Sequence, residues 1–302
     1  MTHLEIPSSV KTIGKYAFNE CSSLEQIAIP SSLTTIKKYA FANCSSLSEI
    51  TLPSSLDSIK NSVFYHCRSL KQISIPSCVT SIGKYAFFGC SSLTQVTIPS
   101  SVITIADYAF TTCSSLKQIS IPSSVISIGD YAFSECKSLE NVELSSSLKS
   151  ISNYVFRYCS SLEQILIPPS VKSISKGAFF GCQKLKQIKI PSSVTEIKPN
   201  AFDSCGLQQV EIPSSITMIK KGTFQNCYSL KSVIIPSSVK TIDNHAFMCC
   251  GSLEEIVIPP SVIVIGIEIL GGCESLTKIT IPSSLKNTID YLLPQNVMII
   301  ET

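Results

Sequence analysis

Cysteine is the residue whose abundance and spacing in this chain could carry chemistry, because thiolates bind metals, form disulfides and act as nucleophiles. The 302 residues include 14 cysteines. Nine of them follow one another at intervals of 23 residues from Cys21 to Cys205, and Cys227, Cys250 and Cys273 resume the interval after one residue is lost. No Cys-x-x-Cys pair of the kind found in zinc sites occurs. The spacing therefore predicts no metal site.

A disulfide framework is also disfavoured. Repeating units stack about 4.8 Å apart when they contribute parallel strands. Side chains in one column then run parallel, and their Cβ atoms stay slightly too far apart for a disulfide. We therefore expect a ladder of buried free thiols that act as small hydrophobic groups, with Cys249, which lies outside the ladder, as the most exposed and reactive cysteine.

Other catalytic side chains are sparse. His3, His66 and His245 lie in different repeats, so at most one of them could act as a general base at a given site. Serine recurs as part of the repeat and not in a Gly-x-Ser-x-Gly elbow, and no Walker loop or Gly-x-Gly-x-x-Gly motif is present. Glu254 and Glu255 are better explained as a charged surface. The sequence predicts a protein that is not an enzyme and has no catalytic residue or cofactor.

The elements that position these residues follow from the repeat. One unit reads Leu24-x-x-Ile27-x-Ile29-Pro30-Ser31-Ser32-Leu33-x-x-Ile36-x-x-x-Ala40-Phe41-x-x-Cys44. The positions of Leu24 and Ile36 are Leu and Ile in all twelve complete units, and that of Phe41 is Phe in eleven. A unit this small cannot bury its own apolar face, so these side chains must face an interior shared with neighbouring units.

Each unit is predicted to alternate one strand with short helical turns. Residues 24–29 alternate with period two and are β-branched, which is typical of a strand, and Pro30 ends it because proline cannot donate to a ladder. Ile36, Ala40 and Cys44 are spaced i, i+4 and i+8, which predicts one or two helical or 3-10 turns on the opposite side. Ser32 and its equivalents are expected to point inward, with hydroxyls bonded to turn backbone.

The pattern Leu-x-x-Ile-x-Ile-Pro-x-Ser-Val-x-x-Ile-Gly-x-x-Ala-Phe-x-x-Cys resembles the leucine-rich repeats of the BspA-like surface-protein family. Ser32 replaces the asparagine of the commoner leucine-rich repeat, and Leu33 follows it by one position instead of two, so the resemblance is to this subclass. It implies a right-handed, curved α/β repeat solenoid, mostly β, with a parallel sheet on one face. It also implies adhesive or partner-binding roles at cell surfaces, such as those of surface antigens.

We expect one array of about thirteen units over residues 1–285 and a C-terminal capping segment over 286–302. Ile263, Val264 and Ile267 replace residues that are polar in many other units. Contact with the cap is the simplest explanation, and a dimer contact is the alternative. The first unit has no cap of its own, so the natural protein is expected to extend upstream, or a second copy covers this end by self-association.

Binding residues are sought where the repeats vary. The position of Ala28 on the exposed side of the strand is Ser or Thr in the early units from Thr51 to Ser120. Later units combine charged and apolar residues there, as an interface patch does. The predicted partner-binding residues are Glu143, Leu166, Lys189, Glu211, Ile234 and Val257.

Two further columns have a structural interpretation. The Gln26 column is expected to form a hydrogen-bonded glutamine ladder. The Tyr16 column is expected to pack over the phenylalanines, with a second adhesive surface as the alternative.

Charge and hydropathy narrow the function classes. The formal net charge of +3 is scattered along the chain, which disfavours nucleic acid as a partner. The longest apolar run, Val262–Ile267, is too short to span a membrane, and the first residues belong to a strand instead of a signal sequence. We predict a non-catalytic protein-binding solenoid at the cell surface or outside the cell, with a host or matrix protein as ligand. The alternative is a cytoplasmic scaffold or regulator.

Overall fold

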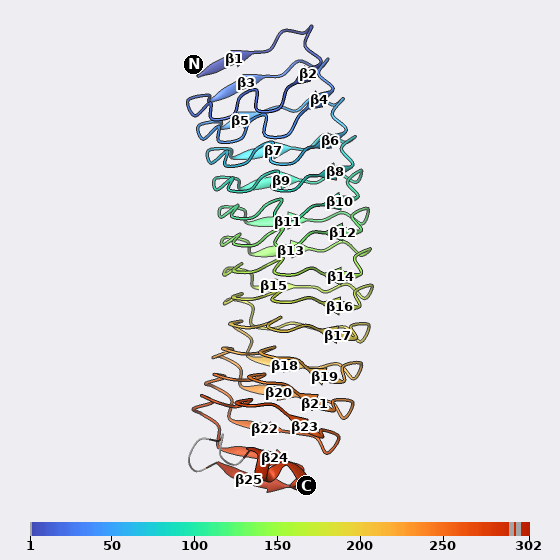
Figure 1. Ribbon diagram of the computed structural model, residues 1–302, viewed down its shortest axis with the longest axis vertical. Helices are drawn as coiled ribbons and strands as arrows, with labels where there is room; N and C mark the ends of the chain where they lie inside the picture. The colour runs from blue at the N-terminus through green and yellow to red at the C-terminus, as the bar shows by residue number, and fades with distance from the viewer. Residues whose placement is uncertain (1, 290–292, 294–296) are drawn as a thin grey trace. The chain divides into compact units, whose positions relative to one another are not determined.

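Short parallel strands, with almost no helix, make up this fold. The computed structural model describes residues 2–289, 293 and 297–302. The chain forms a mostly-β parallel solenoid of about 13 turns, which confirms the predicted fold class (Figure 1). The chain consists of two compact units. The first contains residues 1–148 and 158–160, and the second contains residues 149–157 and 161–302.

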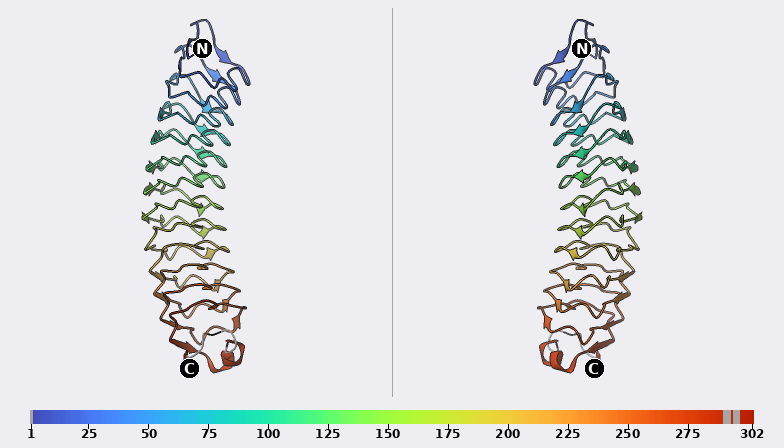
Figure 2. Two further views of the ribbon diagram at one scale, coloured as in Figure 1. Left: turned by 90° about the vertical axis from the view of Figure 1, so that its left-hand side faces the viewer. Right: turned by 90° about the vertical axis from the view of Figure 1, so that its right-hand side faces the viewer.

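In the first unit, each coil contributes two short strands. The first row follows the predicted strand positions, and the second row includes the Ile36 column; the arrows of the first row follow one another along one side (Figure 2). The first row comprises β1 (His3–Glu5), β3 (Gln26–Ala28), β5 (Glu49–Ile50), β7 (Gln72–Ser74), β9 (Gln95–Thr97), β11 (Gln118–Ser120) and β13 (Asn141–Glu143). The second row comprises β2 (Thr12–Ile13), β4 (Thr35–Ile36), β6 (Ser58–Ile59), β8 (Ser81–Ile82), β10 (Thr104–Ile105) and β12 (Ser127–Ile128).

The second unit has the same two rows and the C-terminal elements. Its first row comprises β15 (Gln164–Ile165), β18 (Gln209–Glu211), β20 (Ser232–Ile234), β22 (Glu255–Val257), β24 (Lys278–Ile281) and β25 (Met298–Glu301). Its second row comprises β14 (Ser150–Ile151), β16 (Ser173–Ile174), β17 (Glu196–Ile197), β19 (Met218–Ile219), β21 (Thr241–Ile242) and β23 (Val264–Ile265). The 3-10 helix η1 (Ser283–Leu285) and helix α1 (Lys286–Ile289) lie between β24 and β25.

Pairing advances by one repeat at each step, always in parallel. In the first unit Ile27 of β3 lies opposite Ile50 of β5. In the second unit Val210 of β18 lies opposite Val233 of β20. Equivalent residues therefore lie directly above one another, as the sequence period requires.

The core consists of the columns predicted from the repeat. Phenylalanines stack in register, with ring centroids 5.1 to 5.8 Å apart in the first unit and 5.4 to 5.7 Å apart in the second. Most of them are fully buried, and Phe18 at the N-terminal edge is half-buried. The Leu24 column is likewise buried, whereas Ile265 is the half-buried member of the Ile36 column. Stacking neighbouring coils thus buries the apolar face that one coil exposes.

The helical turns expected around Ala40 are wrong in detail, because this segment is a series of β-turns. Tyr39 and Asn43 have φ values of 60° and 61°, outside the helical region. The N–H of Ala40 donates to Lys37 O within its own coil, whereas that of Phe41 donates to Val63 O of the next coil. Alternate N–H groups thus bond in different directions. A helix would direct all of them along its own axis and leave none for the neighbouring coil.

The tyrosine column occupies the first positive-φ position of each turn. In the first unit Tyr85, Tyr108 and Tyr131 stack with centroids 4.9 and 4.8 Å apart, and the Lys84 amine lies 5.3 Å from the Tyr85 centroid. Bulky residues in this conformation carry strain of order 1–3 kcal/mol, which ring stacking helps to offset. Where the column becomes Gly177, the Tyr154 ring lies over the glycine.

The repeat that loses a residue contains a buried carboxylate, which the sequence analysis did not single out. Asp203 is 4% exposed and accepts hydrogen bonds from Ser204 Oγ at 2.8 Å, Asn226 Nδ2 at 3.0 Å and Asn200 Nδ2 at 3.0 Å. These bonds satisfy a charge that would otherwise be costly to bury.

At the C-terminus the first row continues beyond the second. β25 pairs in parallel with β24, placing Ile299 opposite Ile279 (Figure 1). The domain boundary at residue 285 remains a prediction. Of the predicted capping segment 286–302, residues 290–292 and 294–296 lie outside the described residues, as does the side chain of Ile289.

The described part of the C-terminal segment leaves the apolar residues in and beside β23 exposed, contrary to the expected contact. Ile263, Val264 and Ile267 are 70%, 51% and 56% exposed. The physical reason is that β24 and β25 extend the first row, whereas these three residues lie in or beside the second row.

We predict that Phe179→Ala lowers the free energy of unfolding by about 3–5 kcal/mol, because it removes a buried ring from a packed column. Phe179 is fully buried between Phe156 and Phe202. Urea denaturation followed by circular dichroism measures the change. The half-buried neighbour Phe180 provides the matched control, and equal losses from Phe179→Ala and Phe180→Ala would contradict the argument.

Candidate functional site

The strand face of the second unit gathers exposed apolar and charged side chains at one repeat position. Leu166 is 75% exposed, Ile234 61% and Val257 54%. Lys189 and Glu211 are exposed at the same position of their repeats. β18 and β20 place Glu211 directly opposite Ile234. Alternation along each strand explains this exposure, because the intervening residue, such as Val210 or Val233, points into the core.

A shallow depression brings three of the predicted binding residues together. Lys189, Glu211 and Ile234 all line it. Polar residues of the Gln26 column and two prolines also line the depression: Gln187, Gln209, Ser232, Pro191 and Pro213. Leu166 and Val257 are exposed on the same row but do not line the depression. This surface can bury apolar groups beside a cation and a carboxylate.

Sequence reasoning missed the contribution of the C-terminal strand to this face. β25 lies beside β24 in register, with Met298 opposite Lys278 and Ile300 opposite Thr280. Val257 in turn lies opposite Thr280. Met298 and Ile300 are 63% and 38% exposed, so both extend the apolar part of the face. The apolar run at residues 297–300 was the available signal, but the repeat period no longer identifies its register.

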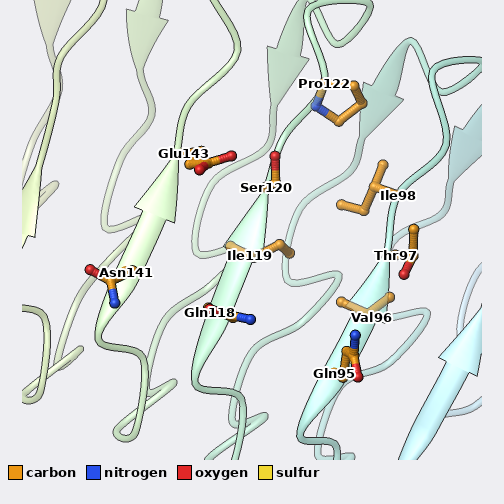
Figure 3. A pocket seen from close by; sticks show the side chains of 10 residues that line it. All are labelled: Gln95, Val96, Thr97, Ile98, Gln118, Ile119, Ser120, Pro122, Asn141 and Glu143. Carbon is orange, nitrogen blue, oxygen red and sulfur yellow. The ribbon is translucent and has the colours of Figure 1, made fainter.

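Glu143 belongs to the first unit, in a different setting. It lines a depression on β9, β11 and β13 in which Asn141, Gln118, Ser120 and Thr97 lie beside apolar residues such as Ile98, and Figure 3 shows these side chains over the strands. Lys189, Glu211 and Ile234 line no part of this depression.

The expected glutamine ladder does not form. Among the described residues, no hydrogen bond joins the side chains of neighbouring glutamines in the Gln26 column, and Gln95 and Gln118 are exposed. Water satisfies such exposed amides at little cost, so a ladder gains little net free energy. These side chains therefore remain available to a ligand.

The serine and cysteine columns behave as predicted. Ser32 Oγ donates to Ser8 O of the preceding coil at 2.6 Å. Other serines of this column donate to a carbonyl two residues later in the preceding coil, as Ser101 Oγ does to Val79 O at 2.7 Å. All 14 cysteines are free. Cys136 Sγ lies 3.2 Å from Phe110 O of the preceding coil, a contact repeated along the ladder. The thiols thus satisfy backbone carbonyls in an otherwise apolar column.

Burial of these thiols suppresses their reactivity. Burial raises the pKa of Cys136 to about 12, an effect opposed by its backbone hydrogen bond and increased by Glu135. Burial, with a smaller effect of Cys21, raises the pKa of Cys44 to about 12. Such thiols are almost entirely protonated at neutral pH. Cys249, expected to be the most exposed, is only half-buried, whereas Cys21 and Cys78 are exposed. Cys21 lies at the N-terminal edge, and Cys78 occupies a serine position at a turn.

The histidines have separate surroundings. His66 lies among Tyr65 and Phe88, and burial, with a smaller contribution from Arg68, lowers its pKa. His245 Nε2 lies 3.3 Å from Glu268 Oε2. The described part of the chain contains no cluster of three or more His, Cys, Asp or Glu residues suited to a metal ion. No helix among the described residues is both long and apolar enough to cross a bilayer.

Comparisons with known proteins agree with this geometry. A family model described as "BspA type Leucine rich repeat region (6 copies)" matches residues 1–113, 80–208 and 195–299. The chain is 26% identical to a leucine-rich repeat protein from Bacteroides ovatus, covering 100% of this chain and 92% of that one, with a TM-score of 0.62. It is 30% identical to a leucine rich cell surface protein from Faecalibacterium prausnitzii, covering 100% and 79%, with a TM-score of 0.58.

The pneumococcal vaccine antigen PcpA shares the fold, at 19% identity and a TM-score of 0.54, over 100% of this chain and 89% of that one. The search of curated proteins returned no significant match.

We predict that alkaline pH destabilises the fold through the thiol ladder. A thiol ionises near pH 8.5 when unfolded, but the pKa of Cys136 is about 12 when folded. Its stabilising contribution is therefore complete below about pH 8.5 and is lost as the pH rises toward 12. The loss is about 1.4 kcal/mol per pH unit for one thiol.

Urea denaturation at intervals between pH 8 and 10.5 measures this slope. Cys136→Ala is expected to make the slope shallower by up to about 1.4 kcal/mol per pH unit. Cys78→Ala, which removes an exposed thiol, serves as the control. Identical slopes for the wild type and Cys136→Ala would refute the prediction.

Proposed function

Because the chain belongs to the BspA-type leucine-rich-repeat family, we propose that it is a non-catalytic binding protein that acts in adhesion or host recognition at a cell surface. The similarity to a leucine rich cell surface protein supports the location. The observation that carries the proposal is the row of exposed Leu166, Ile234 and Val257 beside Lys189 and Glu211 on the strand face of the second unit.

The proposed ligand is a host or matrix protein with an apolar patch flanked by charge. Burying one fully exposed aliphatic side chain contributes roughly 1.5–3 kcal/mol, so three partly exposed ones supply a substantial part of a binding free energy. Few residues usually dominate an interface, and they lie in well-packed pockets. Ile234, which lines the depression with Lys189 and Glu211, is therefore the proposed anchor. The charged pair contributes chiefly to orientation and selectivity.

Glu143 is proposed as a binding residue of the first unit. The depression that it lines combines the amides and hydroxyls of Asn141, Gln118 and Ser120 with largely buried aliphatic side chains. The contribution expected from it is a polar contact, smaller than that of the apolar residues in the second unit.

We expect combined replacement of Leu166, Ile234 and Val257 by Ser to abolish ligand binding without lowering thermal stability by more than a few degrees, because all three side chains are exposed. Immobilised extracellular matrix proteins and host receptors are screened with the wild type, and the variant is then compared on each ligand found. Ile126→Ser, which removes an isoleucine of the first unit that is 57% exposed, is the matched control. Unaltered affinity in the triple variant would reject this surface.

Antibody staining of intact and permeabilised source cells tests the proposed location. Staining of intact cells is expected for a surface protein. Staining only after permeabilisation would favour the alternative, a cytoplasmic scaffold or regulator, for which the 14 free cysteines are the supporting observation. Burial of most of these thiols protects them in either compartment, so they do not decide the question.

A further inference from the structure

The second row of strands in the second unit ends at an open edge. β19, β21 and β23 pair in that order. One repeat beyond Val264 is residue 287, which lies in helix α1 (Lys286–Ile289). The next strand of this row is therefore replaced by a helix, while the first row continues through β24 and β25 (Figure 1).

Two backbone acceptors of β23 and its flank remain open at this edge. Where β21 pairs with β23, Lys240 O and Ile242 O accept hydrogen bonds from the N–H groups of Ile263 and Gly266 at 2.9 and 2.7 Å. The equivalent acceptors one coil later are Ile263 O and Ile265 O. No described residue donates a hydrogen bond to either of them. These two carbonyls are two residues apart, as are the Lys240 and Ile242 carbonyls that accept hydrogen bonds from the coil of β23.

Apolar side chains border the same edge. Ile263 is 70% exposed, Val264 51% and Ile267 56%. One repeat earlier, these positions are Lys240, Thr241 and Asn244. Edge strands of soluble proteins are usually protected by charged residues, proline or a covering element. This edge lacks those charges on its own outward positions, and its apolar residues favour occupation by another polypeptide.

We propose that this edge is a β-augmentation site that accepts an extended segment of another protein, added in parallel to β23. Such sites take affinity from main-chain hydrogen bonds and selectivity from side-chain contacts. The segment would donate two N–H groups three residues apart to Ile263 O and Ile265 O. Aliphatic side chains on the segment would cover Ile263, Val264 and Ile267. The site is separate from the strand face proposed for adhesion.

An extended segment fits this edge better than a folded second copy. Stable pairs of folded proteins bury roughly 800 Å² on each partner. Three partly exposed aliphatic side chains at one short edge supply only a small part of that area. A single strand needs little more than the open acceptors and their apolar border.

A peptide copied from this chain is a suitable probe. Residues 99–107, with the sequence PSSVITIAD, contain Ile103 and Ala106, whose N–H groups donate to Thr80 O and Ile82 O at 2.9 Å each. The peptide therefore contains two donors with the required spacing, and Ile103 occupies the repeat position of Ile263. Fluorescence polarisation of the labelled peptide measures its binding to the full chain.

The matched control is the same peptide N-methylated at Ile103 and Ala106, which lacks both donors. We expect its affinity to be lower by about tenfold, the effect of two lost hydrogen bonds. Combined replacement of Ile263, Val264 and Ile267 by Ser is expected to weaken binding of the unmodified peptide several-fold. Replacement of Leu166, Ile234 and Val257 by Ser is expected to leave it unchanged, which separates this site from the adhesion surface.

Three results would overturn the proposal: no binding of the unmodified peptide, equal binding of the N-methylated one, or binding unaffected by the triple replacement at 263, 264 and 267. Sedimentation velocity of the chain alone tests whether a second copy of the chain occupies the edge. A dimer that dissociates in the same triple variant would assign the edge to a second copy. Circular dichroism establishes that each variant is folded, as expected for replacements of exposed residues.

Discussion

The alternation of backbone hydrogen bonds in the turn segment of each coil is the constraint on which the rest of the structure depends. One N–H closes a β-turn within its own coil, as Ala40 does with Lys37, and the next donates to the following coil, as Phe41 does with Val63. Both turn closure and coil stacking therefore use the same few residues. Positive φ at Tyr39 and Asn43 follows from this arrangement.

Because equivalent side chains lie next to one another in successive coils, each favourable contact between them is repeated along the solenoid. Phenylalanine rings stack, cysteine thiols meet the carbonyls of the preceding coil, and serine hydroxyls satisfy its turns. Because these columns stabilise the fold, the outward positions of the strands are not needed for core packing. Residues such as Leu166 and Lys189 can therefore vary without loss of the fold, which is how a repeat scaffold acquires a binding surface.

The errors in the sequence interpretation have a common origin. The spacing of Ile36, Ala40 and Cys44 suits a helix, but the same spacing also arises when a chain of β-turns directs those residues inward. A single coil cannot distinguish the two, because the deciding hydrogen bonds are made to its neighbour. The exposure of Ile263 was misjudged for a related reason: the sequence after residue 285 is apolar enough to cover it, but β25 continues the other row of strands.

The sequence by itself determined the solenoid, the length and register of its repeat, the buried columns and the free state of the cysteines, because a strict period specifies which residues stack on which. It also identified the outward column that contains Leu166, Ile234 and Val257. Only the tertiary structure decided that a second row of strands includes the Ile36 column, that Lys189, Glu211 and Ile234 share one depression, and that β23 ends at an open edge. Those features depend on hydrogen bonds and contacts between coils, which no single repeat encodes.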